Sequence, residues 1–204
     1  SDVLKELGFS VSLTFQSIYG EGKGDLSSLL SITGEKGTSH WIGMAPFATH
    51  AGKIYPLEKM EEVMARLSAL PNVKIFLFGG GPKETSILNE WAEQYPSTLC
   101  IAGKLKWAEE LALMSHLDVM VSMDSSNMHL ASMVHTPVLS IWGATHPYAG
   151  FMGWKQPDTY AIQTEMECRP CSIFGNKPCH RGDYACLHGI SPELIVERIE
   201  SFLS

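Results

Sequence analysis

The chain has 204 residues, of which 45% are hydrophobic and 18% charged, and its formal net charge is −7 at pH 7. This composition is that of a globular domain long enough to bury one substantial core. The acidic balance argues against a nucleic-acid partner, because proteins that bind a phosphate backbone usually present a basic face. The sequence contains no apolar run near the roughly 20 residues of a membrane-spanning helix, and no signal-peptide pattern. We therefore expect a cytoplasmic protein.

The first 40 residues carry little regular pattern. A short helix signal covers residues 3–7, and a Gly- and Ser-rich segment follows it. Alternation of apolar strands and amphipathic helices begins only at Trp41. We expect residues 41–204 to form the folded domain, and residues 1–40 to pack loosely or stay partly mobile.

The first strand–helix unit places a polar loop before a helix. Residues 41–46 read as a short buried strand, and residues 47–54 as a loop that contains Thr49 and Lys53. Beyond Pro56, apolar residues recur at helical spacing, namely Met60, Val63, Met64, Leu67 and Leu70. A flexible lysine at the carboxyl end of a strand can reach a phosphate as a compact charge. The alternative for Lys53 is an ordinary solvated surface lysine.

The second unit is rich in glycine at its turn. Residues 73–78 read as a strand, three glycines and Glu84 follow, and a helix presents Ile87, Leu88, Trp91 and Tyr95 on one face. The glycines do not form the dinucleotide pattern G-x-G-x-x-G, because Glu84 stands at its third glycine, and no phosphate-binding G-x-x-x-x-G-K-[ST] loop occurs. A carboxylate at this edge can instead accept hydrogen bonds from ribose hydroxyls. The alternative for Glu84 is a first-turn glutamate stabilised by the helix dipole.

The next two units end in the densest polar turn of the chain. Residues 99–103 are apolar and precede a helix predicted over residues 107–115. A strand over residues 119–123 then stops at Asp124, the first of four short polar residues suited to capping a helix over residues 128–134. The free amides of such a helix, with the positive end of its dipole, favour an anion and most often a phosphate. The alternative is that Asp124 is only an N-cap and His129 only a polar helix residue.

The pattern Asp-Ser-x-x-x-His-Leu-Ala from Asp124, with the following Thr-Pro-Val and Trp-Gly-Ala-Thr-His-Pro segments, resembles a glycosyltransferase family that includes the ADP-heptose:lipopolysaccharide heptosyltransferases. The resemblance implies that this turn binds the diphosphate of a nucleotide-sugar donor, through Asp124, Ser125, Ser126 and His129. Ser126 stands where the family usually has Gly. A second match, at the loop before Tyr55, implies that Thr49 and Lys53 also bind the diphosphate.

The resemblance extends to the nucleoside and to the reaction. It assigns Glu84 to the ribose, and Leu105 with the backbone of Lys104 to the adenine. It implies an inverting transfer of a sugar, heptose from ADP-heptose, in the synthesis of lipopolysaccharide or a related glycan. The implied reaction requires no divalent metal, which fits the absence of a D-x-D motif from the sequence.

The resemblance also implies a fold and a missing partner. Family members have two Rossmann-like halves in the GT-B arrangement, and this chain matches the C-terminal, donor-binding half. We expect a doubly wound α/β domain of five or six parallel strands, with residues 1–40 as the linker and a remnant of the N-terminal half. That half would supply the catalytic base and bind the glycan or glycolipid acceptor, with peripheral attachment to the inner membrane. We therefore expect no catalytic residue here, and donor binding without efficient transfer by this chain alone.

Four cysteines cluster within residues 167–188, namely Cys168, Cys171, Cys179 and Cys186. The first pair has the C-x-x-C spacing of zinc ligands, but the second pair does not fit a standard zinc knuckle. A reducing cytoplasm argues against stable disulfides. Zinc, free thiols and oxidised pairs stay open as alternatives, and we assign no metal and no cofactor. After this segment, Ser191 and Pro192 open a last helix, whose predicted buried side is Leu194, Ile195, Ile199 and Phe202.

The sequence has two alternative interpretations besides glycosyl transfer. A non-catalytic nucleotide-binding module, or an interaction module stapled by zinc, would keep the same fold without needing Lys53 or Asp124 for activity. A sugar-nucleotide epimerase is disfavoured, because the chain offers no clear pair of histidines or carboxylates to flank the sugar.

Overall fold

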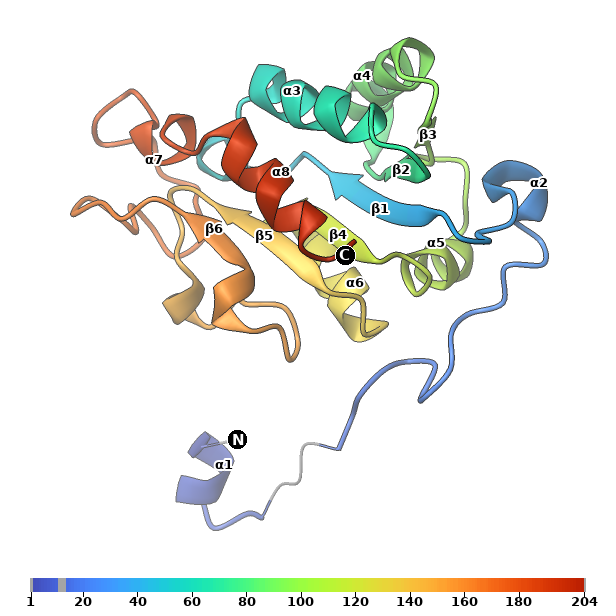
Figure 1. Cartoon of the computed structure of the whole chain (residues 1–204). Helices are drawn as coiled ribbons and strands as arrows, with labels where there is room; N and C mark the ends of the chain where they lie inside the picture. Colours follow the sequence, from blue (N-terminus) through green and yellow to red (C-terminus); the bar gives the residue numbers. More distant parts are fainter. Residues whose placement is uncertain (1, 11–13, 204) are drawn as a thin grey trace.

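The structure, a computed structural model, describes residues 2–10 and 14–203. Its centre is one six-stranded sheet in the order β3-β2-β1-β4-β5-β6, with all neighbouring strands parallel (Figure 1). The strands are β1 (His40–Ala45), β2 (Val73–Leu77), β3 (Thr98–Cys100), β4 (Val119–Met123), β5 (Val138–Trp142) and β6 (Ala161–Gln163). The order reverses between β1 and β4, which is the point where open α/β sheets bind ligands. The predicted doubly wound α/β fold is confirmed.

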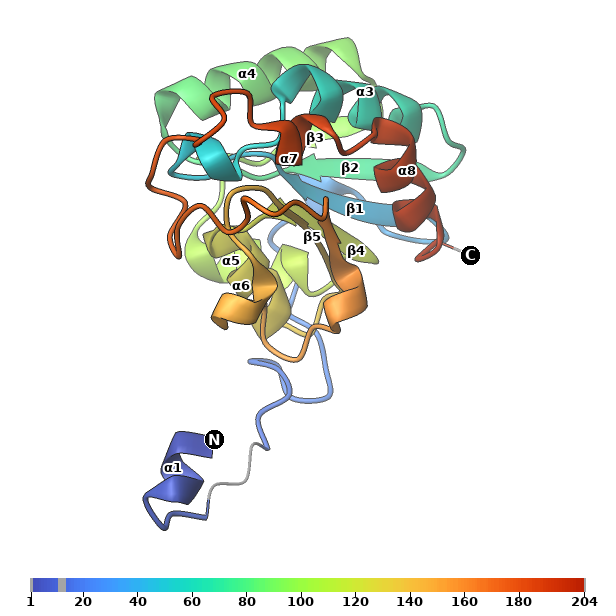
Figure 2. The same cartoon turned by 90° about the vertical axis from the view of Figure 1, so that its left-hand side faces the viewer.

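Helices cover both faces of the sheet (Figures 1 and 2). One face carries α3 (Leu57–Ser68), α4 (Gly81–Gln94) and α8 (Pro192–Glu200), and the other carries α5 (Trp107–Met114) and α6 (Ser126–Met133). The shorter elements are α1 (Asp2–Glu6), α2 (Leu30–Thr33), α7 (Ala185–His188) and the 3-10 turns η1 (Ala51–Lys53), η2 (Pro147–Ala149) and η3 (Asp158–Tyr160). Among these helices, none is both long and apolar enough to cross a bilayer.

Each strand feeds two apolar layers, because successive side chains of a strand point to opposite faces. In β4, Val119 and Val121 belong to the layer under α3 and α8, whereas Met120 belongs to the layer over α5 and α6. In β5, Ile141 and Trp142 divide in the same way. A strand buried on both faces has no polar alternation, so it reads in the sequence as a continuous apolar run.

The last helix begins as predicted, but one of its predicted buried residues is exposed. The Ser191 hydroxyl accepts a hydrogen bond from the Leu194 amide at 3.3 Å, as its predicted capping role requires. Ile195 and Ile199 are fully buried, but Leu194 is 41% exposed, so its predicted burial is wrong. The buried stripe follows the four-residue repeat from Ile195 to Ile199, and Leu194 lies just outside it.

The segment before β1 is more firmly packed than predicted. Leu29 is 1% exposed and lies in the core layer shared with α5 and α6. The Gly24 amide donates a hydrogen bond to Ser115 Oγ at 2.9 Å. The expected loose packing of residues 1–40 is therefore wrong for the part that includes these contacts, whereas α1 stands away from the sheet in both views (Figures 1 and 2).

Leu29→Ala should lower the free energy of unfolding by about 2–4 kcal/mol, because it removes a buried side chain from a closed core. The neighbouring Leu30→Ala is the matched control, since Leu30 is 39% exposed, and it should cost less than about 1 kcal/mol. Urea unfolding followed by circular dichroism measures both. Equally small losses from the two changes would contradict the docking of this segment.

Candidate functional site

A pocket of about 660 Å³ opens at the carboxyl ends of the strands. The loops that follow β1, β2, β3, β4 and β5 line it, together with residues beyond β6. Nine donor-binding residues are predicted from the sequence, and eight of them line this pocket, namely Thr49, Lys53, Glu84, Leu105, Asp124, Ser125, Ser126 and His129. Lys104 is exposed and does not line the pocket, although its neighbours Gly103 and Leu105 do.

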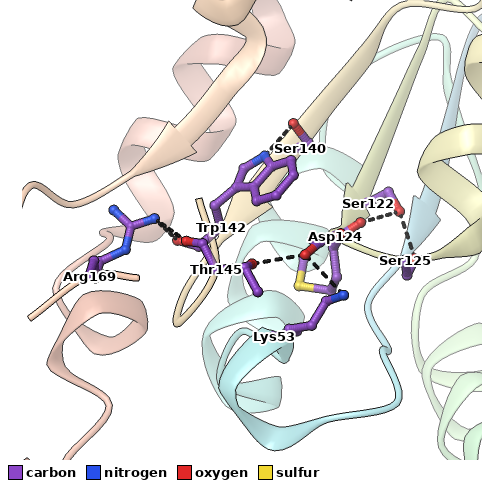
Figure 3. Close-up of polar contacts among 9 residues, drawn as sticks. Lys53, Ser122, Asp124, Ser125, Ser140, Trp142, Thr145 and Arg169 are labelled. Atoms are coloured by element: carbon purple, nitrogen blue, oxygen red, sulfur yellow. Dashed lines mark hydrogen bonds and ion pairs between the residues drawn. The ribbon is translucent and has the colours of Figure 1, made fainter. Parts of the chain in front are cut away.

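An ion pair between the half-buried Lys53 and the buried Asp124 lines the pocket, and Figure 3 shows its contacts. Lys53 Nζ is 2.9 Å from Asp124 Oδ2, and Thr145 Oγ1 donates to the same oxygen at 2.8 Å. Asp124 is only 4% exposed, so its carboxylate needs both partners to offset the loss of water. The carboxylate does not cap α6, and the interpretation of Asp124 as only an N-cap is therefore wrong.

The N-terminus of α6 has no side-chain cap. Ser125 occupies the N-cap position, but its hydroxyl lies 3.2 Å from Ser122 Oγ and makes no capping hydrogen bond (Figure 3). The helix begins at Ser126, two residues before the predicted start, and Ser126 and Asn127 line the pocket. First-turn amides left open in this way, at the positive end of the helix dipole, favour an anion.

Two glycines allow three chain segments to cross at Lys53. The Ala144 amide donates to Gly52 O at 2.7 Å, and a Cβ on the adjacent Gly143 would lie 2.4 Å from that same oxygen. Gly175 has φ +72°, and a Cβ there would lie 2.6 Å from Lys53 Cγ. A side chain at either glycine would therefore displace the lysine or its loop.

Arg169 braces the loop that carries Thr145. Its half-buried guanidinium donates to Thr145 O at 2.9 Å (Figure 3). It also donates to Gly143 O and to Thr164 O, each at 2.5 Å. Burial lowers the pKa of Arg169, with the nearby Cys186 acting in the opposite direction. The brace joins residues 167–188 to the carboxyl ends of β5 and β6, and so holds Thr145 against the carboxylate.

The two ends of the pocket differ in character. At the β2–β3 end, Glu84 lines the pocket. Its Oε2 accepts a hydrogen bond from the amide of Gly80, the N-cap residue of α4, at 2.8 Å. Burial raises the pKa of Glu110 at the same end. The β5–β6 end is apolar and is lined by Phe151, Ile173 and Phe174.

The sequence model of glycosyltransferase family 9 (heptosyltransferase) matches residues 16–178, which is most of the chain. The chain belongs to this family. Lipopolysaccharide heptosyltransferase 3 of Escherichia coli is 29% identical over 108 residues, which cover 52% of this chain and 32% of that protein.

Solved structures of family 9 enzymes share the fold. A glycosyl transferase of family 9 from Veillonella parvula superposes with a TM-score of 0.75 at 20% identity, covering 99% of this chain and 58% of its own. The E. coli heptosyltransferase WaaC, solved with ADP, superposes with a TM-score of 0.63 at 18% identity, covering 98% of this chain and 53% of its own. The chain thus spans less than two thirds of each relative's length.

His129 of this family 9 domain is poised toward its neutral form. The residue as a whole is exposed, yet desolvation of its ring lowers the pKa of His129 below the ordinary value. Asp124 opposes this shift, and Lys53 adds to it. At neutral pH the ring can therefore both donate and accept a hydrogen bond at the pocket wall.

The cysteines of the domain are free thiols, and Cys100 and Cys186 are buried. Burial raises the pKa of Cys186. Within residues 2–10 and 14–203, no group of three or more His, Cys, Asp or Glu side chains is placed to hold a metal ion.

Sequence reasoning missed two groups of residues. Thr145 and Arg169 support the ion pair, and Phe151, Ile173 and Phe174 form the apolar end. Thr145 lies in the Trp-Gly-Ala-Thr-His-Pro segment of the family resemblance, but nothing there signals a contact with the carboxylate. Residues 169–174 carry no helix or strand pattern, and Cys171 is their only residue in a recognisable motif.

Arg169→Gln should lower the free energy of unfolding by about 2–4 kcal/mol, because it leaves several carbonyl groups of the brace without a donor. Arg181→Gln is the matched control, since Arg181 is about half exposed and pairs with Asp183 at the surface. The control should cost less than about 1 kcal/mol. Guanidinium unfolding curves give both values, and equal losses would show that the brace does not act as described.

The imidazole of His129 should titrate below pH 6.5, because its pKa is lowered in the folded chain. As the pH falls through about 6.5, protons bind the unfolded chain first, so acid lowers stability through this group. NMR titration, with the signal assigned by a His129→Gln variant, measures the midpoint. The variant should also lose less stability on acidification than the unmodified chain. A midpoint above the ordinary value would contradict the desolvation of the ring.

Proposed function

We propose that this chain is the donor-binding half of an inverting, metal-independent glycosyltransferase that transfers heptose from ADP-heptose in lipopolysaccharide or related glycan synthesis. The observation that carries the proposal is the uncapped N-terminus of α6 beside the half-buried Lys53. Family membership supports glycosyl transfer, and the E. coli relative solved with ADP supports the nucleotide.

The diphosphate would lie between the α6 terminus and Lys53. One donor of the ammonium group engages Asp124, and a lysine has three. The charge of the pair is balanced, so the open amides of Ser126 and Asn127 supply much of the attraction for the anion. This is how an acidic chain can bind a diphosphate, because local field decides binding rather than net charge. Thr49 lines the same stretch of the pocket and would add a hydroxyl donor.

The reaction would use these groups at the leaving phosphate. An acceptor hydroxyl loses its proton to a base expected in the N-terminal half, and its oxygen attacks the anomeric carbon from the face opposite the diphosphate. The bond from that carbon to the phosphate oxygen breaks, and the electron pair stays on the diphosphate. The α6 amides and Lys53 are fixed in place to stabilise this charge as it develops. His129 would add one hydrogen bond from the pocket wall.

The nucleoside would lie at the β2–β3 end of the pocket. Glu84 commits one oxygen to the Gly80 amide and can accept from a ribose hydroxyl with the other. Leu105 and Gly103 line the adenine end, whereas the Lys104 side chain lies outside it. The acceptor, a glycan or glycolipid, would bind through the N-terminal half of a cytoplasmic enzyme attached peripherally to the inner membrane.

Calorimetric titration with ADP in the absence of divalent metal tests the proposal. We expect saturable binding, weakened at least about ten-fold by Lys53→Met, which keeps the aliphatic stem but removes the charge. Lys83→Met is the matched control, because Lys83 is exposed and lies outside the pocket. If Lys53→Met leaves the affinity for ADP unchanged, the result would favour a nucleotide-binding module in which Lys53 does not bind the diphosphate. No binding by the folded chain would overturn the proposal.

A further inference from the structure

The apolar end of the pocket consists of Ile173 and Phe174, which are exposed, and Phe151, which also packs against the core layer of α5 and α6. Ile173 is 57% exposed and Phe174 is 59% exposed, although both are large and hydrophobic. The rings of Phe174 and Phe151 lie 5.8 Å apart at a tilt of 56°, so the two aromatics form one continuous surface. Exposed apolar surface that lines a pocket usually marks the place of a ligand or partner.

This surface begins directly beside the Lys53–Asp124 pair. Gly175, the residue after Phe174, lies so close to the Lys53 stem that a Cβ there would meet Cγ at 2.6 Å. Hydrogen bonds to the loop after β5 hold the segment in that position. Arg169 donates to Thr145 O at 2.9 Å, and the Cys171 amide donates to Ala144 O at 2.8 Å.

The topology assigns the two ends of the pocket to different parts of a bound donor. The sheet order places the β2–β3 loops on one side of the Lys53–Asp124 pair and the segment beyond β6 on the other. In a nucleotide-sugar, the nucleoside and the sugar leave the diphosphate in opposite directions. With the nucleoside near Glu84, the sugar therefore extends toward Phe174.

We propose that Phe174, with Phe151 and Ile173, forms the wall against which the donor sugar packs, and that Phe174 is a specificity-determining residue of the donor site. This inference rests on the proposed function and deepens it. A pyranose ring has an apolar face of C–H groups, and an aromatic ring offers a flat, polarisable surface that matches it. The segment of residues 167–188 would then serve as a substrate wall.

Calorimetric titrations with two probes, ADP and ADP-heptose, test the wall. For Phe174→Ala we expect affinity for ADP-heptose to fall about ten-fold, because the variant loses the apolar contact with the sugar. Affinity for ADP should stay within about two-fold, since ADP lacks the sugar. Phe174→Tyr should retain both affinities. Leu194→Ala, at an exposed leucine of α8 outside the pocket, should change neither.

The ratio of the two affinities separates the possible failures. If Phe174→Ala weakens ADP and ADP-heptose equally, or weakens neither, the sugar wall is overturned while the diphosphate site stands. If the folded, unmodified chain binds neither probe, the proposed function is overturned and this inference with it. Circular dichroism of each variant confirms that the fold is intact.

Discussion

The ion pair between Lys53 and Asp124 is the contact on which the rest of the site depends. Removing an ion from water costs several kcal/mol unless it is paired and hydrogen-bonded, and here Thr145 completes the pairing. If Lys53 moved away, the buried carboxylate of Asp124 would keep only the Thr145 hydroxyl as a partner. The loop after β1 and the turn after β4 are therefore fixed relative to each other, and the start of α6 meets a cation whose position is already set.

The sheet makes this pairing possible. The strand order reverses between β1 and β4, so the chain leaves these two neighbouring strands toward opposite faces. The loops part there and leave a crevice, which the 660 Å³ pocket occupies. Glycines 52 and 143 then let the loop after β5 close on the first loop, and Arg169 locks that closure from outside. Because the loops after β1, β4 and β5 are held by these contacts, a ligand would bind with little rearrangement of the backbone.

The sequence predicted the parts of this arrangement that are local. The central strands β1, β4 and β5 are buried on both faces and read as apolar runs, and polar residues at strand ends identified Lys53, Glu84 and Asp124. The parts that depend on distant contacts were not predictable. Asp124 has a strong local capping propensity, yet its carboxylate binds the distant residues Lys53 and Thr145. The irregular segment that delivers Arg169 and Phe174 has no periodicity from which its path could be inferred.

The docking of Leu29 changes where the folded unit begins. Its side chain fills the layer under α5, and the backbone near Gly24 is fastened to Ser115. A chimera of family 9 enzymes joined at the start of β1 would therefore pack the corresponding segment of another enzyme against this core. Recombination ahead of Ser17, which is itself buried, would keep the Leu29 segment together with the core that it contacts. The position at which the domain can be recombined without disturbing its core is thus set by Leu29, a side chain outside the sheet.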